Sequence, residues 1–196
     1  MLRRFPIQRG ITLIETLIGM TIVAILLGLG APSFSSFLQN RQIRNAAESI
    51  QNGLSLARSE AVRRNTSVQF VLGAGSSWRV GCTTADADCP DSIQARTSAE
   101  GSSNASVATS QVLAATNTVA GTAVFSTSLG FNGFGKASAL PAGNNAVFDI
   151  SNPPAGTCAK AGGTLRCLRV VVTAGGQIRM CDPKLTDSNP NNPQAC

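Results

Sequence analysis

Residues 9–21 read RGITLIETLIGMT, and this stretch opens the longest apolar run in the chain. The run extends from Ile11 to Ala31, 21 residues that include one charged side chain, Glu15. As a helix it would be about 30 Å long, which matches the hydrocarbon thickness of a bilayer. A carboxylate at mid-bilayer depth costs about 3 kcal/mol, so Glu15 requires a specific explanation.

An apolar run of this kind has three possible interpretations. An ordinary signal peptide has a shorter apolar run and a small-residue cleavage site, whereas here Pro32 directly follows the run and Glu15 interrupts it. A lipoprotein signal needs a cysteine at the end of the run, and none is present there. The remaining interpretation is a retained membrane anchor, whose cytoplasmic flank would hold three arginines, Arg3, Arg4 and Arg9.

The residues around Gly10 resemble the class III signal of the type IV pilin superfamily: a basic leader ending in glycine, then I-T-L-I-E, then an apolar helix. The resemblance implies that a prepilin peptidase cuts between Gly10 and Ile11, and that Ile11 is then N-methylated. It also implies that Glu15, the fifth mature residue, recruits the subunit by pairing with the free amine of a neighbour's Ile11. The alternative is that Glu15 extends to the lipid head groups.

The resemblance further implies a division of the chain into four parts. These are a cleaved leader (1–10), a membrane and filament-core helix (11–31), its amphipathic continuation (32–65) and a periplasmic β-rich domain (66–196). The protein would cross the inner membrane once, with its N-terminus in the cytoplasm, and later join a pilus at the cell surface. Its expected partners are that membrane, a prepilin peptidase/methyltransferase, and the other minor and major pilins of the filament.

The helical pattern resumes after Pro32, so this proline predicts a kink rather than an end. Apolar residues recur there at spacings of three and four, as an apolar stripe about 100° wide. The charged residues lie mostly off it, and Arg44 and Glu48 are one turn apart, as in a helical ion pair. We therefore expect one helix from about 11 to 65, with this stripe against the following strands: Ile43, Ala46, Ala47, Ile50, Leu54, Ala57 and Ala61.

From Thr66 onward apolar residues recur at a period of two, which is typical of strands. A polar, low-complexity loop is expected at 97–110. The clearest hairpin is CLRVVVT-AGG-QIRMC, 167–181. A three-residue loop there places Val172 opposite Ile178 and gives Gly176 the left-handed conformation. Further strands are predicted at 68–72, 78–82, 122–126, 130–135 and 146–150.

The predicted fold class is α+β: a long N-terminal helix packed on an antiparallel β-sheet domain with disulfides, as in the type IV pilin fold. Two later motifs are ARSEAVRRN (57–65) and GG-x-x-R-x-C-D-P (175–183). They resemble the FimU/FimT kind of minor pilin and the related GspH pseudopilins of type II secretion.

All six cysteines follow residue 81, and the sequence has no CxxC motif and no histidine that would indicate a zinc site. An even number of cysteines beyond a membrane anchor indicates disulfides in an oxidising compartment, the alternative being unrelated buried thiols. The hairpin register separates Cys167 from Cys181. Sequence proximity favours the pairs Cys82–Cys89, Cys158–Cys167 and Cys181–Cys196.

The composition argues against catalysis and against strong binding of nucleic acid. Without histidine, tyrosine or a GxSxG motif, no catalytic, cofactor-binding or metal site is predicted. The formal charge of +6 falls to +3 (6 minus 3) without the leader arginines. DNA-binding FimT-like proteins carry G-R-x-R, but here Gln177 replaces the first arginine. Arg169 and Arg179 are the candidates for a weak DNA contact.

Three functions are consistent with these observations. The favoured one is a structural minor pilin of a type IV pilus, near the tip, that helps to prime assembly for motility and adhesion. The alternatives are a minor pseudopilin H of a type II secretion system and a DNA-binding minor pilin for natural transformation. Cysteine content favours the first, because the resemblance gives pseudopilins of this subtype few cysteines.

Overall fold

The computed structural model describes residues 10–114, 127–138, 140–188 and 192–196, without the side chains of 29–33 and 186–188. The chain forms two compact units, residues 1–37 and 38–196. The strand expected at 122–126 lies outside the described residues.

The long helix α1 (Leu13–Arg64) contains 52 residues, as the sequence pattern predicted to within two residues at each end. It ends at Asn65, whose φ of 50° is left-handed. The Asn65 N–H donates to the Val62 carbonyl (3.3 Å) and the Thr66 N–H to the Ala61 carbonyl (3.2 Å), which together satisfy the last turn as a Schellman motif. Pro32 lies inside α1, and the kink there stays a prediction.

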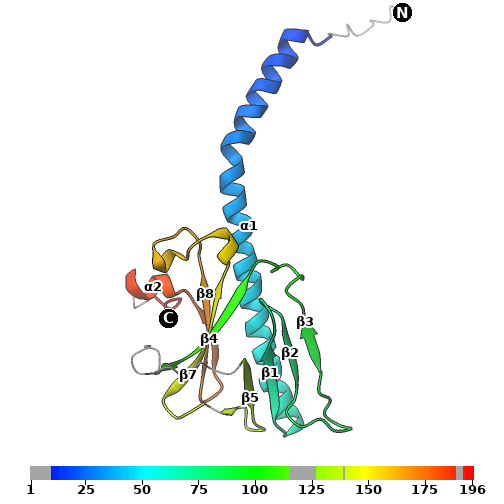
Figure 1. Ribbon diagram of the computed structural model, residues 1–196, viewed down its shortest axis with the longest axis vertical. Helices are drawn as coiled ribbons and strands as arrows, with labels where there is room; N and C mark the ends of the chain where they lie inside the picture. Colours follow the sequence, from blue (N-terminus) through cyan, green and yellow to red (C-terminus); the bar gives the residue numbers. More distant parts are fainter. Residues whose placement is uncertain (1–9, 115–126, 139, 189–191) are drawn as a thin grey trace, which may run out of the picture. The chain divides into compact units, whose positions relative to one another are not determined.

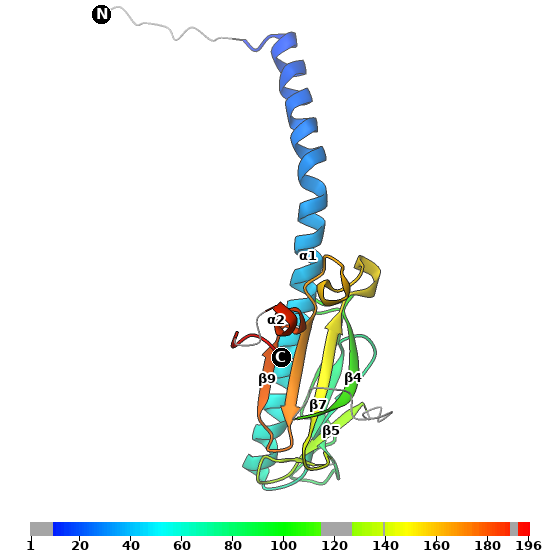
Figure 2. The same cartoon turned by 90° about the vertical axis from the view of Figure 1, so that its left-hand side faces the viewer.

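The β-strands form two antiparallel sheets beside the C-terminal part of α1 (Figures 1 and 2). The five-stranded sheet has the order β3 (Gln94–Arg96), β2 (Trp78–Cys82), β1 (Val68–Leu72), β5 (Ser128–Phe131) and β6 (Ala137–Ser138). The four-stranded sheet has the order β4 (Ser106–Leu113), β7 (Asn144–Ser151), β8 (Leu168–Thr173) and β9 (Ile178–Cys181). Short helical turns complete the fold: η1 (Pro153–Ala155), η2 (Ala159–Ala161) and α2 (Pro183–Ser188).

This architecture confirms the α+β prediction but corrects some details. The prediction of a polar loop at 97–110 was wrong from residue 106 onward. Strand β4 begins there, and every residue of β4 pairs with β7. The strand expected at 130–135 is displaced: β5 ends at Phe131, and a turn follows. The short edge strand β3 was not expected. In these segments the pairing partner, rather than local hydrophobicity, determines the strand.

The hairpin of β8 and β9 has the predicted register. Val172 lies opposite Ile178, and Val170 lies opposite Met180. Gly176 has a φ of +83°, as a three-residue loop requires. The inward-facing side chains of this hairpin join the main core, whereas Val171 on the other face belongs to a second small apolar cluster.

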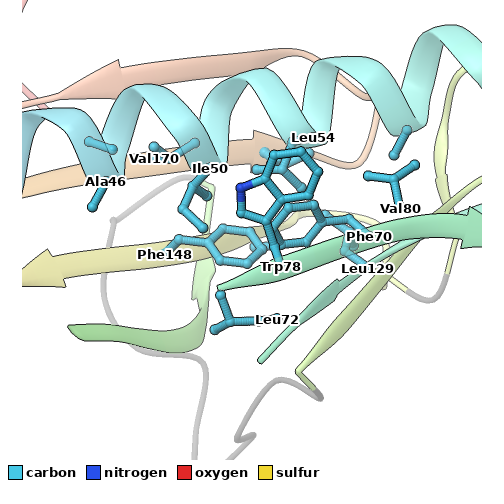
Figure 3. Packing of buried hydrophobic residues seen from close by; sticks show 14 of the residues in the cluster. Ala46, Ile50, Leu54, Phe70, Leu72, Trp78, Val80, Leu129, Phe148 and Val170 are labelled. Carbon is cyan, nitrogen blue, oxygen red and sulfur yellow. The ribbon is translucent and has the colours of Figure 1, made fainter. Parts of the chain in front are cut away.

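The predicted stripe of α1 forms the centre of the main core, and all seven of its side chains are fully buried. Figure 3 shows Phe70, Trp78 and Phe148 facing this helix from the two sheets. The Phe70 ring lies 5.8 Å from each of the other two aromatic rings. The Trp78 Nε1–H donates to the buried Ser49 hydroxyl at 2.7 Å, so the polar edge of the indole is satisfied against the helix.

The six cysteines form three disulfides in the structure, and these are the pairs that sequence proximity favoured. The Cα–Cα distances are 5.7 Å for Cys82–Cys89, 5.4 Å for Cys158–Cys167 and 5.1 Å for Cys181–Cys196. In the hairpin, Arg169 rather than Cys167 lies opposite Cys181. The third disulfide ties the C-terminal segment to β9.

The contact between α1 and the aromatic residues depends on Gly53. A Cβ at this position would lie 2.8 Å from Phe70 Cε2 and 3.0 Å from the Trp78 indole. We expect Gly53→Val to lower the free energy of unfolding by about 1–3 kcal/mol, because the rings must shift. Asn52→Val adds the same side chain at an exposed neighbouring position and is the matched control. Thermal unfolding followed by the fluorescence of Trp78, the single tryptophan, measures both; equal midpoints would contradict the close packing.

We expect non-reducing peptide mapping of the folded chain to recover the three disulfides of the structure and no others. Each should contribute about 2–3 kcal/mol by restricting the unfolded chain. A peptide that joined Cys167 to Cys181 would contradict both the pairing and the hairpin register, since these residues are not opposite each other.

Candidate functional site

The three described residues that precede α1 are accessible. Gly10, Ile11 and Thr12 are outside regular structure and exposed, and Ile11 is 74% exposed. Among the described residues, no heavy atom lies within 4 Å of the position that a Cβ at Gly10 would take. This part of the chain therefore imposes no steric requirement for glycine at this position.

Thr12 caps the N-terminus of α1. Its side-chain Oγ1 accepts a hydrogen bond from the Glu15 N–H at 3.3 Å, and its carbonyl accepts from the N–H groups of Glu15 (3.1 Å) and Thr16 (3.2 Å). Thr12 to Glu15 form the T-x-x-E pattern of a capping box, a signal in the sequence that our prediction had not used. Glu15 thus lies in the first turn of α1, where the helix dipole favours a negative charge.

Glu15 is also the exception among the polar side chains near the start of α1. The Thr16 hydroxyl donates to the Leu13 carbonyl at 2.8 Å, and the Thr21 hydroxyl donates to the Ile18 carbonyl at 2.8 Å. Both hydroxyls are therefore satisfied within the helix. Within the part of the chain that the structure describes, the exposed Glu15 carboxylate has no hydrogen-bond or ion-pair partner.

The first unit exposes apolar side chains in every direction around the helix. Within the described residues, no helix is both long and apolar enough to cross a membrane. A helix with apolar residues on all sides nevertheless needs a cover. The side chains that are more than half exposed include Ile11, Leu13, Ile14, Leu17, Ile18, Met20, Ile22, Val23, Ile25, Leu26 and Leu27.

The two candidate DNA contacts, Arg169 and Arg179, have structural partners. Arg169 forms a bidentate pair with Asp149 (2.7 and 2.9 Å), the residue opposite it in the β7–β8 register. Arg179 donates to the backbone carbonyl oxygens of Ala195 (3.2 Å) and Cys196 (3.0 Å). The sequence alone did not reveal Asp149 as a partner, because the pairing depends on the register of separate strands.

Another pair of arginines, Arg63 and Arg64, lies at the end of α1. Arg63 and Arg64 both bind the carboxylate of Glu60, at 2.6 and 2.8 Å. The hydrogen bond from Arg63 is the main reason that the pKa of Glu60 lies below its usual value, and Arg64 adds to it. Among the described residues, no group of three or more histidine, cysteine or acidic side chains could hold a metal ion.

Comparison with known proteins places these features in a family. Residues 6–31 match the model of the prokaryotic N-terminal methylation motif, which includes Gly10, Ile11 and Glu15. Residues 46–176 match the family described as type II transport protein GspH. No match to a curated protein sequence was found.

Solved structures that are similar to the chain at low sequence identity include a minor pilin and a minor pseudopilin. The Pseudomonas aeruginosa type IV minor pilin FimU is 15% identical, with 70% of this chain and 90% of that chain covered and a TM-score of 0.46. The Vibrio cholerae minor pseudopilin EpsH of the type 2 secretion system is 14% identical, with 72% and 98% covered and a TM-score of 0.47.

The two sequence matches have clear consequences. The methylation motif and the GspH family together imply processing by a prepilin peptidase and assembly with other pilin-type subunits. Their members are structural pilins and pseudopilins. Because the GspH model matches more than half of the sequence, this chain belongs to the GspH family, among the minor pilins and minor pseudopilins of the type IV pilin superfamily.

Proposed function

We propose that this chain is a structural minor pilin of a type IV pilus, incorporated near the tip, where it helps to prime pilus assembly. Residues 1–10 are removed as the leader, and residues 11–31 anchor the chain in the inner membrane until assembly. The segment from 66 onward lies in the periplasm and then at the cell surface, and the helix between them continues from the anchor.

The observation that carries this proposal is the Glu15 carboxylate. Thr12, Thr16 and Thr21 are hydrogen-bonded within α1, but Glu15 has no partner among the described residues. In a dry bundle of apolar helices an unpaired charge is costly, so pairing with a neighbour's N-terminal amine would compensate Glu15 and fix the axial register. Glu15 lies in the first turn of α1, at the same end of the helix as the amine that cleavage before Ile11 would create.

Disulfides favour a pilus over a secretion machine. Three bridges within the unit of residues 38–196 suit a subunit that leaves the periplasm for the exterior, where no reductant protects thiols. The match to the GspH family supports the second candidate, a minor pseudopilin H of a type II secretion system. A DNA receptor is the least favoured candidate, because Asp149 and the C-terminal segment engage Arg169 and Arg179.

Processing at the Gly10–Ile11 bond is the first test. We expect Gly10→Val to leave the uncleaved precursor in the inner membrane, although no atom of the described residues crowds a Cβ at this position. The loss of cleavage would therefore be due to the poor fit of valine in the active site of the peptidase. Mass spectrometry of the wild-type mature protein should begin at N-methylated Ile11. A mature N-terminus at residue 31 or later would contradict the assignment of the anchor.

Recruitment by Glu15 is the second test. We expect Glu15→Ala to be cleaved and folded normally but to be absent from sheared filaments, because it lacks the charge that pairs with a neighbour's amine. Glu48→Ala is the matched control, since it removes a carboxylate from the same helix within the other unit. Quantification of each variant in the sheared and membrane fractions measures incorporation, and equal recovery of both variants would show that Glu15 has no recruiting role.

The phenotypes of the same strains distinguish a type IV pilus from a type II secretion system. On the pilus proposal, the Glu15→Ala strain loses surface filaments and twitching motility, while the export of exoproteins stays at the wild-type level. The opposite result, normal motility with exoproteins retained in the periplasm, would favour the pseudopilin.

A further inference from the structure

A tight turn at Asn132–Lys136 presents one aromatic ring to solvent. The Asn132 side-chain Oδ1 accepts hydrogen bonds from the N–H groups of Phe134 and Lys136, both at 3.1 Å. The Asn132 N–H donates to the Lys136 carbonyl at 3.0 Å, and the Gly135 N–H to the Asn132 carbonyl at 2.8 Å. Four hydrogen bonds within five residues fix the backbone of this turn.

The surrounding structure holds the turn in place. Arg58 Nε at the end of α1 donates to the Gly135 carbonyl at 3.2 Å. A Cβ on Gly135 would lie 3.2 Å from Val62 Cγ2, and its φ of +73° also favours glycine. A Cβ on Gly176, in the β8–β9 loop, would lie 1.9 Å from the Gly135 carbonyl oxygen. The turn is therefore packed between α1 and the hairpin loop.

The Phe134 side chain in this turn is not part of the hydrophobic core. Phe134 is 87% exposed, and the nearby Val62 is 51% exposed. A groove of about 540 Å³ lies between α1 and the hairpin, lined by residues that include Val62, Ser59 and Ile178. Because the backbone of this turn is already fixed, binding through Phe134 would order little further main chain, and aromatic side chains are enriched at protein interfaces.

Cationic side chains flank this turn: Lys136 belongs to it, Arg58 donates to the Gly135 carbonyl, and Arg63 lines the same groove as Val62. Arg58, Arg63 and Lys136 are exposed here. In this last part of α1 the Glu60 carboxylate binds both Arg63 and Arg64, so it compensates only part of their charge. A complementary surface would carry an apolar pocket with carboxylates at its rim.

We propose that the Phe134 face, formed by Val62, Phe134, Lys136, Arg58, Arg63 and Ile178, docks on a neighbouring pilin-type subunit through an apolar pocket ringed by Asp or Glu. This inference rests on the proposed function for the identity of the partner. A second copy of the chain fits poorly, because a two-fold contact would bring the cations of both copies together. Single-stranded nucleic acid stacks on several aromatic residues, whereas Phe134 is the one exposed aromatic side chain among the described residues of 38–196.

Photo-crosslinking in the native bacterium tests the proposal on the full chain. p-Benzoylphenylalanine replaces Phe134, the cells are irradiated, and mass spectrometry identifies the cross-linked peptide. We expect one adduct, with a pilin-type subunit, at a segment rich in Asp or Glu. An adduct with a second copy, lipid, DNA or a protein outside the filament would overturn the proposal, as would the absence of any adduct.

Variants test the energetics of the same contact, with the partner found by crosslinking as the probe. We expect Phe134→Ser to lower the amount of partner that co-purifies with the full chain at least about tenfold, as at a hot spot. Leu113→Ser, which removes another exposed apolar side chain, is the matched control and should retain the partner. Both should keep the wild-type melting temperature. Equal retention by both variants would overturn the proposal.

Charge reversal gives a readout that a general loss of stability would not reproduce. Lys136→Glu should weaken partner retention, and changing a rim carboxylate of the partner to lysine should restore it. Absence of this rescue would overturn the electrostatic part of the proposal. If Glu15→Ala abolishes incorporation while Phe134→Ser retains its partner, only this inference fails. If Glu15→Ala assembles normally, the proposed function fails instead.

Discussion

The structure depends on the burial of one face of α1 by two sheets at once. The stripe from Ile43 to Ala61 is fully buried, and four of its seven members are alanine. Small side chains, together with Gly53, let the rings of Phe70 and Trp78 approach the helix closely. Neither sheet could bury its aromatic residues without the helix, and the helical stripe would be exposed without both sheets. The unit of residues 38–196 therefore has a single main core, to which the helix and both sheets contribute.

Two parts of α1 differ in how their apolar side chains are distributed around the helix. From 43 to 61 the apolar residues form one stripe, and the other faces carry ion pairs such as Arg44–Glu48. From 11 to 28 apolar side chains cover the helix on all sides, and the threonine hydroxyls bond to the helix itself. A stripe can be buried within one chain, whereas an all-round apolar surface requires lipid or other helices. Glu15 is costly in either surrounding unless a cation compensates it, which is why this residue carries the functional proposal.

The features that depend on local periodicity could be predicted from the sequence. The features that depend on pairing between strands distant in the sequence could not. The stripe and the β8–β9 register follow from local spacing, and both agree with the structure. Strand β4 has a polar sequence that resembles a loop, and it is a strand because β7 offers eight partners. For the same reason the Arg169–Asp149 pair could not be predicted, since it depends on the register between β7 and β8. The two arginines that resembled a DNA contact in the sequence both have partners within the fold.

Charge pairing at Glu15 cannot by itself determine which subunits become neighbours. Every subunit processed in this way would present an N-terminal amine, so that interaction would fix axial register but would not distinguish one subunit from another. Specificity would then have to come from surfaces that differ between subunits. The turn at Asn132–Lys136 has the required properties, because its backbone is fixed by hydrogen bonds and by contacts with α1, while its aromatic side chain contributes nothing to the core. Recruitment into the filament and the choice of the neighbouring subunit would thus depend on separate parts of the same chain. The first would depend on Glu15 in the apolar part of α1, and the second on the turn beside the end of α1.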